Sequence, residues 1–272
     1  MKLLRLLSIT VAIVAPLSAQ TPTPTATEVE AQVKQELKEA ARAYREGDFT
    51  VAQAHSERAL LLDPQNKTAP MFVARTIHAQ YKPGDFTPEN IAKAREAIIA
   101  YQAIFSRSPA DDEAYKAVAY LYGAIKEDEL LREWVFQRAG NASIDNAKRA
   151  EAYTVLASRD WDCSFKITEL PGHKVTTVKG DKAPVSYRMP KAQAEFERAK
   201  GCANRGLEMA NMAITLTPED ESAWSYKTNI LLELAKLAEM SGDVQYKREL
   251  LRQYEEALNE TTRIANRSRP KP

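Results

Sequence analysis

The sequence of 272 residues contains few of the residues that build most metal and enzyme sites. It has two cysteines and three histidines, and none of these histidines has a second histidine or a cysteine at a ligand spacing. Two cysteines are also too few for a disulfide-scaffolded miniprotein. Nine glycines and fourteen prolines exclude a collagen-like or low-complexity chain. Because 44% of the residues are hydrophobic, a folded protein with a sizeable core is predicted.

An excess of one charge is also missing. Lys and Arg number 38 against 37 Asp and Glu, a net charge of +1, so no nucleic-acid partner is expected. The sequence contains no Gly-rich phosphate loop, no Gly-x-Ser-x-Gly and no His-Glu-x-x-His. Acid pairs such as Asp111-Asp112 and Asp220-Glu221 stand at expected helix starts, where carboxylates favour the helix dipole. We therefore expect no enzyme, no cofactor and no metal site.

The N-terminus has the composition of a secretory signal peptide. Lys2 and Arg5 precede an uncharged segment over residues 6–17, and two small residues follow for cleavage. A membrane span needs about 20 apolar residues, so no stable membrane anchor is expected. The alternative, a first core helix, is disfavoured by the prolines that follow. We expect a signal peptide over 1–19, a Thr/Pro-rich tether over 20–30, and export to the periplasm or the cell exterior.

After the tether the sequence predicts helix after helix. Apolar and small residues recur three and four apart, and turn residues such as Gly47-Asp48 and Asp63-Pro64 separate the segments. The expected helices cover 28–46, 49–62, 71–81, 91–105, 114–125, 129–139, 147–160, about 191 to 217, 223–240 and 246–265. They form five helical hairpins in one domain over 31–265, and the basic tail at 266–272 follows.

The hairpins resemble the tetratricopeptide repeat (TPR) family. In the first unit Ala52, Ala59 and Pro64 match the second half of the repeat, although Glu39 stands where the family prefers Leu. Further matches are Val73, Ala74, Ile77, Tyr101 and Pro109 in the second unit, Tyr115, Val118, Ala119 and Tyr122 in the third, Tyr153, Leu156, Ala157 and Pro218 in the fourth, and Trp224 in the fifth. The resemblance implies an all-α, right-handed α-solenoid of about five TPR-like hairpins, each hiding the apolar face of its neighbour.

The resemblance also implies a function. First helices of such arrays line a concave groove that binds peptides or protein segments, so a protein or peptide partner of unknown identity is expected. The groove candidates, carried over by position, are Tyr44, Arg45, Arg75, His78, Lys116, Tyr120, Thr154, Ser158, Ser225 and Asn229. An acidic segment would suit Arg45, Arg75 and Lys116, although ordinary solvated helix faces would carry the same residue types. Tyrosines such as Tyr101 are expected to fill the core.

The fourth unit departs from the repeat. Between residues 163 and 190 the chain is expected to leave the helix and form a small β-hairpin or ordered loop, which caps the array, binds, or is disordered. In the repeat register Cys163 and Cys202 become neighbours, which favours a disulfide in an oxidising compartment. The alternative is two buried thiols.

Three functions therefore stay open. The favoured one is a non-enzymatic exported scaffold. The alternatives are a structural subunit of a cell-envelope or secretion assembly, and an enzyme whose site lies on the 163–190 insertion. The apolar run over residues 230–237 is predicted to be either a terminal cap or a homodimer face.

Overall fold

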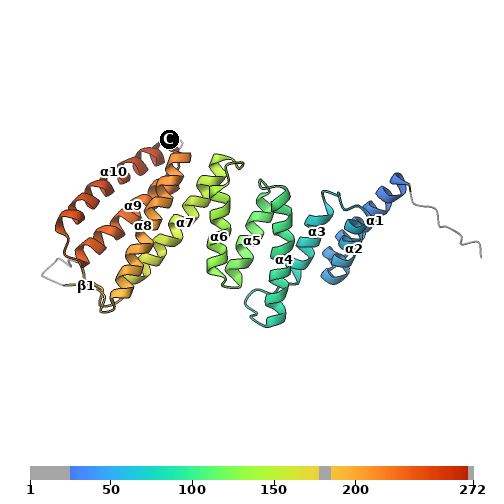
Figure 1. Cartoon of the computed structure of the whole chain (residues 1–272), viewed down its shortest axis with the longest axis horizontal. Coiled ribbons are helices and arrows are strands. Elements are labelled where there is room, and N and C mark those ends of the chain that lie inside the picture. The colour runs from blue at the N-terminus through green and yellow to red at the C-terminus, as the bar shows by residue number, and fades with distance from the viewer. Residues whose placement is uncertain (1–24, 178–184, 269–272) are drawn as a thin grey trace, which may run out of the picture.

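The computed structural model describes residues 25–177 and 185–268 as a row of helical hairpins stacked in chain order (Figure 1). The helices are α1 (Ala26–Glu46), α2 (Phe49–Leu62), α3 (Ala69–Gln80), α4 (Pro88–Arg107), α5 (Asp112–Ala124), α6 (Asp128–Gly140), α7 (Asn146–Thr168), α8 (Gln193–Leu216), α9 (Glu221–Met240) and α10 (Val244–Ser268). The all-α solenoid of five hairpins is confirmed. The signal peptide, residues 20–24 of the tether, the turn at 179–184 and the end of the tail lie outside the described residues.

The helices begin and end close to the expected positions because local signals set them. Asp48, Asp111 and Asp220 each cap a helix through a carboxylate that accepts backbone N–H groups of the first turn. Gly47 ends α1 in the left-handed conformation, with φ at 82°. The array is longer than expected at both ends, since α1 begins at Ala26 and α10 continues to Ser268.

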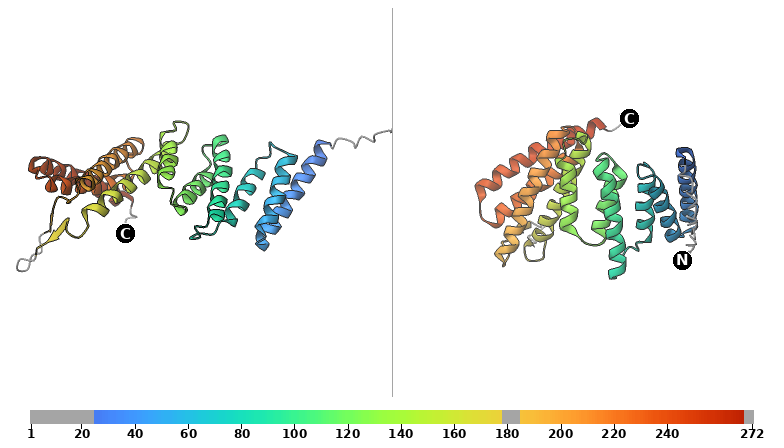
Figure 2. Two further views of the ribbon diagram at one scale, coloured as in Figure 1. Left: turned by 60° about the horizontal axis from the view of Figure 1, so that its bottom comes forward. Right: turned by 45° about the vertical axis from the view of Figure 1, so that its right-hand side comes forward.

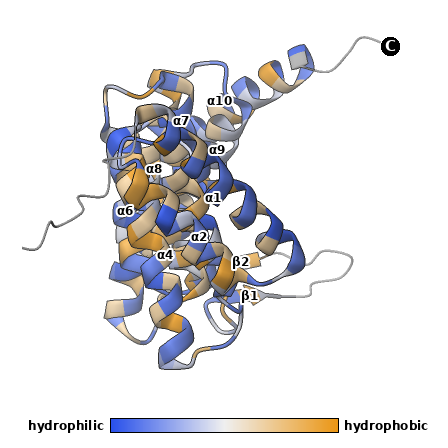
Figure 3. Cartoon of the chain, turned by 90° about the vertical axis from the view of Figure 1, so that its right-hand side faces the viewer, coloured by the Kyte–Doolittle hydropathy of each residue, from blue (hydrophilic) through white to orange (hydrophobic). Residues whose placement is uncertain are grey.

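Small residues allow the helices to approach closely. Ala40, Ala74 and Ala157, at the expected close-contact positions, have no exposed surface. Each second helix also contacts the first helix of the next unit, and the two views in Figure 2 show this order along the whole row. Between units two and three, the ring of Phe105 lies 4.8 Å from that of Trp134. Viewed along the row, hydrophilic and hydrophobic residues alternate along the helices (Figure 3), as expected for amphipathic elements.

The apolar run of α9 is covered within the chain. Ile230, Leu231, Leu234 and Leu237 are buried, and α9 packs against α8 and α10. Leu232 alone among the leucines of this run is substantially exposed, at 37%. This run therefore belongs to the core, and the structure does not support it as an apolar dimer face.

The boundaries of the insertion differ from the prediction. The first helix of the unit was expected to end at Asp160, but α7 continues to Thr168, so residues 163–168 are helical. The strands β1 (Lys174–Thr176) and β2 (Val185–Tyr187) pair antiparallel. This hairpin contacts α9. The backbone N–H of Tyr187 donates a hydrogen bond to Glu239 Oε1 at 3.0 Å. The last turns of α7 are stabilised by tertiary contacts that local propensity does not report.

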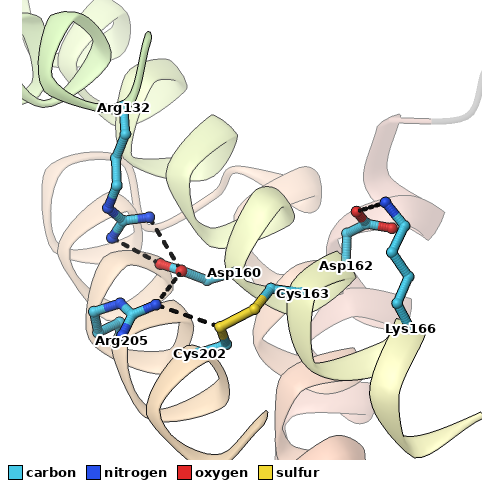
Figure 4. The surroundings of a disulfide bond; sticks show 7 residues. All are labelled: Arg132, Asp160, Asp162, Cys163, Lys166, Cys202 and Arg205. Carbon is cyan, nitrogen blue, oxygen red and sulfur yellow. Dashed lines mark hydrogen bonds and ion pairs between the residues drawn. A yellow bond between two sulfur atoms is a disulfide. The ribbon is translucent and has the colours of Figure 1, made fainter. Parts of the chain in front are cut away.

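A disulfide joins Cys163 in α7 to Cys202 in α8, with the two Cα atoms 6.0 Å apart. Cys163 lies inside a helix, not past its end as the repeat register had suggested. Beside the disulfide, Asp160 is 2% exposed and receives hydrogen bonds from both Arg132 and Arg205 (Figure 4). Because Arg132 comes from α6, this buried carboxylate links the third unit to the fourth.

Candidate functional site

A shallow pocket of about 270 Å³ opens where the first unit meets the second. Tyr44 comes from the end of α1, Arg75 and His78 come from α3, and Tyr101 comes from α4. The full lining is Tyr44, Arg75, His78, Ala79, Tyr81, Pro83 and Tyr101. Four of these seven side chains carry an aromatic or imidazole ring, so the pocket presents flat, weakly polar walls.

The turn after α3 supplies one wall. Asn90 is buried, and its amide donates to the carbonyl oxygens of Lys82 at 2.8 Å and Asp85 at 2.7 Å. Its Oδ1 accepts the Lys82 N–H at 2.8 Å. Gly84 provides the positive φ that the turn requires, at 83°. These bonds fix the turn, and with it the positions of Tyr81 and Pro83 beside the pocket.

The His78 ring contacts one ring in its own unit and one in the next unit. The His78 ring lies 5.9 Å from the Tyr101 ring, perpendicular to it, and 5.7 Å from the Tyr120 ring on α5. Burial lowers the pKa of His78, so its imidazole is neutral at pH 7. Burial also raises the pKa of Tyr101 and of Tyr81, which keeps both phenols protonated. The ring walls are therefore uncharged.

One hydrogen-bonding group in the wall has no partner. Tyr81 is 6% exposed, and its buried hydroxyl forms no hydrogen bond with any residue that the structure describes. A buried polar group without a partner carries a desolvation cost of about 1–3 kcal/mol.

Arg75 carries the only formal charge in the lining, and that charge is neutralised. Its Nε and Nη2 donate to the two carboxylate oxygens of Glu113 on α5, each at 2.5 Å. The hydrogen bonds from Arg75 outweigh desolvation and lower the pKa of Glu113. Arg75 was expected to be available to an acidic partner, and the ion pair corrects that expectation.

A second hollow of about 400 Å³ continues from the first. It is lined by Ala41, Tyr44, Arg45, Phe72 and Arg75, so the two hollows share Tyr44 and Arg75. Within residues 25–177 and 185–268, neither Arg45 nor Lys116 forms an ion pair. Lys116 lies on the face of α5 that carries Glu113 and Tyr120, since these residues are three and four apart. Of these two cations, Arg45 borders the second hollow, whereas Lys116 lies on α5 and lines neither hollow.

Five of the ten predicted groove residues meet in one region of the structure. Tyr44, Arg45, Arg75, His78 and Tyr120 are brought together around these two hollows. Thr154 is only 8% exposed and lines no open surface, which corrects its assignment to the groove.

The other predicted positions lie farther along the array. The Ser158 hydroxyl donates to the carbonyl of Val155 in its own helix. Ser225 and Asn229 lie half-buried on α9. None of the three lines either hollow between the first two units.

Sequence reasoning missed four residues that line the first pocket: Ala79, Tyr81, Pro83 and Tyr101. Tyr101 is 2% exposed and fills the core as predicted, yet one side of its ring borders the pocket. Tyr81, expected as the last residue of the helix over 71–81, is the C-cap of α3, and Pro83 lies in the Lys82-Pro83-Gly84-Asp85 turn that follows. A turn containing Pro and Gly directly after a tyrosine could have signalled a fixed wall.

Two further observations concern the described residues. Their helices include none with enough length and apolar character to cross a membrane. No cluster of three or more His, Cys, Asp or Glu side chains suited to a metal ion occurs among them.

Comparison with known proteins gives structural neighbours alone. No family model and no curated protein matches the sequence. A crystal structure of MamA protein is 14% identical, with a TM-score of 0.43 over 89% of this chain and 99% of that one. MamA 41-end from Desulfovibrio magneticus RS-1 is 10% identical, with a TM-score of 0.42 over 88% of this chain and 98% of that one. A tetratricopeptide repeat protein from Parabacteroides merdae ATCC 43184 is 15% identical, with a TM-score of 0.36 over 89% of this chain and 95% of that one.

Proposed function

We propose that this chain is an exported, non-enzymatic scaffold that binds a peptide or protein segment on the first-helix face of its first three units. The observation that carries the proposal is the pair of hollows joined at Tyr44 and Arg75. Neutral rings border one hollow, and Arg45, which has no ion pair among the described residues, borders the other. Such a surface offers apolar contact area together with hydrogen-bonding groups, as peptide-binding surfaces do.

The rigidity of the surface supports binding. The pocket walls come from three packed helices, α1, α3 and α4, and one turn held by Asn90, so little ordering is required when a ligand binds. Export is proposed on two grounds: the signal-peptide composition of residues 1–19, and the Cys163–Cys202 disulfide, which suits an oxidising compartment.

A photocrosslinking experiment tests the proposal. A photoreactive phenylalanine analogue is installed at Tyr120 in one variant and at Phe136 in another, and the exported fraction of the native host is irradiated. These two aromatic residues are each 50% exposed, but Tyr120 lies on α5 beside His78 and Phe136 lies on the second helix of the same unit.

The proposal expects a discrete adduct at position 120 that disappears when Tyr44→Ala is added, and none at position 136. Equal adducts at both positions, unaffected by Tyr44→Ala, would instead support the structural subunit of an envelope or secretion assembly. An exported fraction without any adduct at position 120 contradicts the scaffold.

A further inference from the structure

We infer that a pocket at the turns of the second unit binds a partner segment in which an aliphatic side chain is flanked by Asp or Glu. This turn pocket has a volume of about 470 Å³, and its lining includes Lys67, Pro70, Met71, Ile104, Arg107 and Asp111. It shares no residue with the two hollows of the proposed binding face. The inference therefore goes beyond the proposed function, because it assigns a second contact surface.

The position of the turn pocket separates it from the first pocket. Pro70 and Met71 lie in the first turn of α3, whereas His78 and Ala79 of the first pocket lie in its last turn. Residues from the end of α4 and the cap of α5 complete the turn pocket. These three helices follow one another along the row (Figure 1), so a ligand in the turn pocket would contact the second unit and the start of the third.

The floor of the turn pocket is aliphatic and can be reached from solvent. Pro70, Met71 and Ile104 are each partly exposed, and Met71 and Ile104 pack against the core of the array. The lining contains no aromatic residue, so a ligand ring would find no ring to stack on. The flexible thioether of Met71 can adapt to aliphatic side chains of different shapes. A Leu, Ile or Met side chain therefore fits this floor best.

The charges of the turn pocket favour an acidic ligand. Lys67 and Arg107 are both exposed, and neither forms an ion pair or a side-chain hydrogen bond with any residue that the structure describes. Asp111 also lines the pocket, but its Oδ1 accepts the Ala114 N–H at 2.9 Å as the cap of α5. The lining thus carries two positive charges and one negative charge. Carboxylates on a ligand would be attracted to the two unpaired cations.

The origin of the two cations favours a polypeptide over a small anion. Lys67 lies in the turn before α3, whereas Arg107 is the last residue of α4. A small anion with one carboxylate can neutralise only one of them. A segment with Asp or Glu on each side of its aliphatic residue carries a carboxylate for each cation. Because an extended chain rises by about 3.3 Å per residue, these neighbours reach the rim while the aliphatic side chain fills the pocket.

Both turns are fixed before a ligand binds. Asn66 Oδ1 accepts the backbone N–H groups of Thr68 and Ala69, each at 2.9 Å. In the other turn, the Asp111 N–H donates to the Ser108 carbonyl oxygen at 2.9 Å. Little backbone ordering is therefore required on binding, and less of the interaction free energy is lost.

Synthetic peptides test the inference on the full chain. Three heptapeptides with an N-terminal fluorescein and a C-terminal amide are compared: central Leu with Asp and Glu flanks, central Ala with the same flanks, and central Leu with Lys flanks. Their Kd values are measured by fluorescence anisotropy. The chains are the unsubstituted protein, Lys67→Gln, Arg107→Gln, Tyr44→Ala and the control Arg198→Gln, which changes an exposed cation of α8 without an ion pair among the described residues.

The acidic Leu peptide should bind most tightly. The Ala peptide should bind at least about fivefold more weakly because it buries less apolar surface, and the Lys-flanked peptide should not bind. Lys67→Gln and Arg107→Gln should each weaken the acidic Leu peptide by about two- to fivefold, the range for an exposed ion pair, and reduce its salt dependence. Arg198→Gln and Tyr44→Ala should leave its Kd unchanged.

Two further measurements accompany the titrations. In protein labelled with ¹³C at the methionine methyl groups, the acidic Leu peptide should shift the Met71 signal, which Met71→Leu identifies by its loss. Circular dichroism of each variant verifies that the fold is intact.

The failure of this inference is distinguishable from that of the proposed function. Equal binding of the Leu and Ala peptides, or equal weakening by Arg198→Gln, overturns the turn pocket as a specific site. A Kd that responds to Tyr44→Ala and not to Lys67→Gln or Arg107→Gln places the peptide on the proposed binding face, so it overturns this inference and supports the proposed function. If the photocrosslinking at position 120 fails while Lys67 and Arg107 are required, the proposed function is overturned and the turn pocket stands.

Discussion

Arg75 on α3 and Glu113 on α5 form a two-pronged ion pair that bridges the second and third hairpins on the proposed binding face. Their side chains are 43% and 45% exposed, so the pair is open to solvent. It joins neighbouring units and removes a positive charge from the pocket. We therefore expect the pair to affect the charge of this surface more than the stability of the fold.

Glu113→Gln should increase affinity for acidic peptides because it leaves Arg75 unpaired. Exposed pairs contribute about 0–1 kcal/mol, so the free energy of unfolding in urea should change by less than about 1 kcal/mol. Fluorescence anisotropy with labelled peptides rich in Asp and Glu measures the gain. Glu249→Gln breaks an ion pair of similar exposure on α10 and should leave the affinity unchanged. An equal change in both variants would show that Arg75–Glu113 does not tune the groove.

Loss of the Cys163–Cys202 disulfide should destabilise the C-terminal half of the array. The two residues are 39 positions apart, and closing such a loop contributes up to about 4 kcal/mol in the chain-entropy model. Urea unfolding of the double variant Cys163→Ser, Cys202→Ser measures the loss. The unsubstituted protein with and without reductant should reproduce the difference. An unchanged unfolding midpoint would mean that the disulfide does not stabilise the described fold.

Alanine substitution should have opposite effects at two glycines of α8. A Cβ at Gly206 would lie 3.1 Å from both the Asp160 Cβ and the Ile230 Cδ1, whereas at Gly201 it would meet only the flexible end of Arg205 at 3.5 Å. Gly201→Ala should stabilise by about 0.5–1 kcal/mol through helix propensity. Gly206→Ala should destabilise, because overpacking costs about 1–3 kcal/mol. Thermal unfolding of both variants measures the contrast, and equal stabilisation would contradict the close packing of α7, α8 and α9.

Stability should fall at low pH through Glu169, which anchors the β-hairpin insertion. Burial tends to raise its pKa, but hydrogen bonds from Lys174 and Lys236 more than offset this, and the pKa of Glu169 falls to about 2 from 4.5. A carboxylate whose pKa is depressed by folding stabilises the protein above its unfolded value of 4.5. That contribution, up to about 3 kcal/mol, is lost as the pH falls from about 4.5 towards 2.

The variant Glu169→Gln is used to measure how the stability contributed by Glu169 changes with pH. The difference in unfolding free energy between the unsubstituted protein and this variant should be largest near pH 6 and should vanish near pH 2. Glu46→Gln, which changes an exposed carboxylate that has no ion pair among the described residues, should show no such trend. A constant difference for Glu169→Gln across the window would contradict the depressed pKa.

The sequence predicted the features that depend on residues close together in the chain. Caps such as Asp48 and Asp220, stops such as Pro64, and buried alanines at three- and four-residue spacing define the helices and their pairing. These interactions span at most a few residues, so sequence patterns report them directly. The stacking order followed because each hairpin has an apolar face that its neighbour must cover.

Tertiary structure decided how residues from different units combine. The α7 helix continues to Thr168 because this side chain donates to the buried Glu233 of α9 at 2.6 Å. The positive charge of Arg75 is balanced by the carboxylate of Glu113. Tyr81 lines the pocket because Asn90 fixes the turn that follows it. Each of these contacts joins residues that local periodicity treats separately. The sequence by itself therefore determined the array of hairpins, whereas packing between units decided which side chains meet and what charge the groove presents.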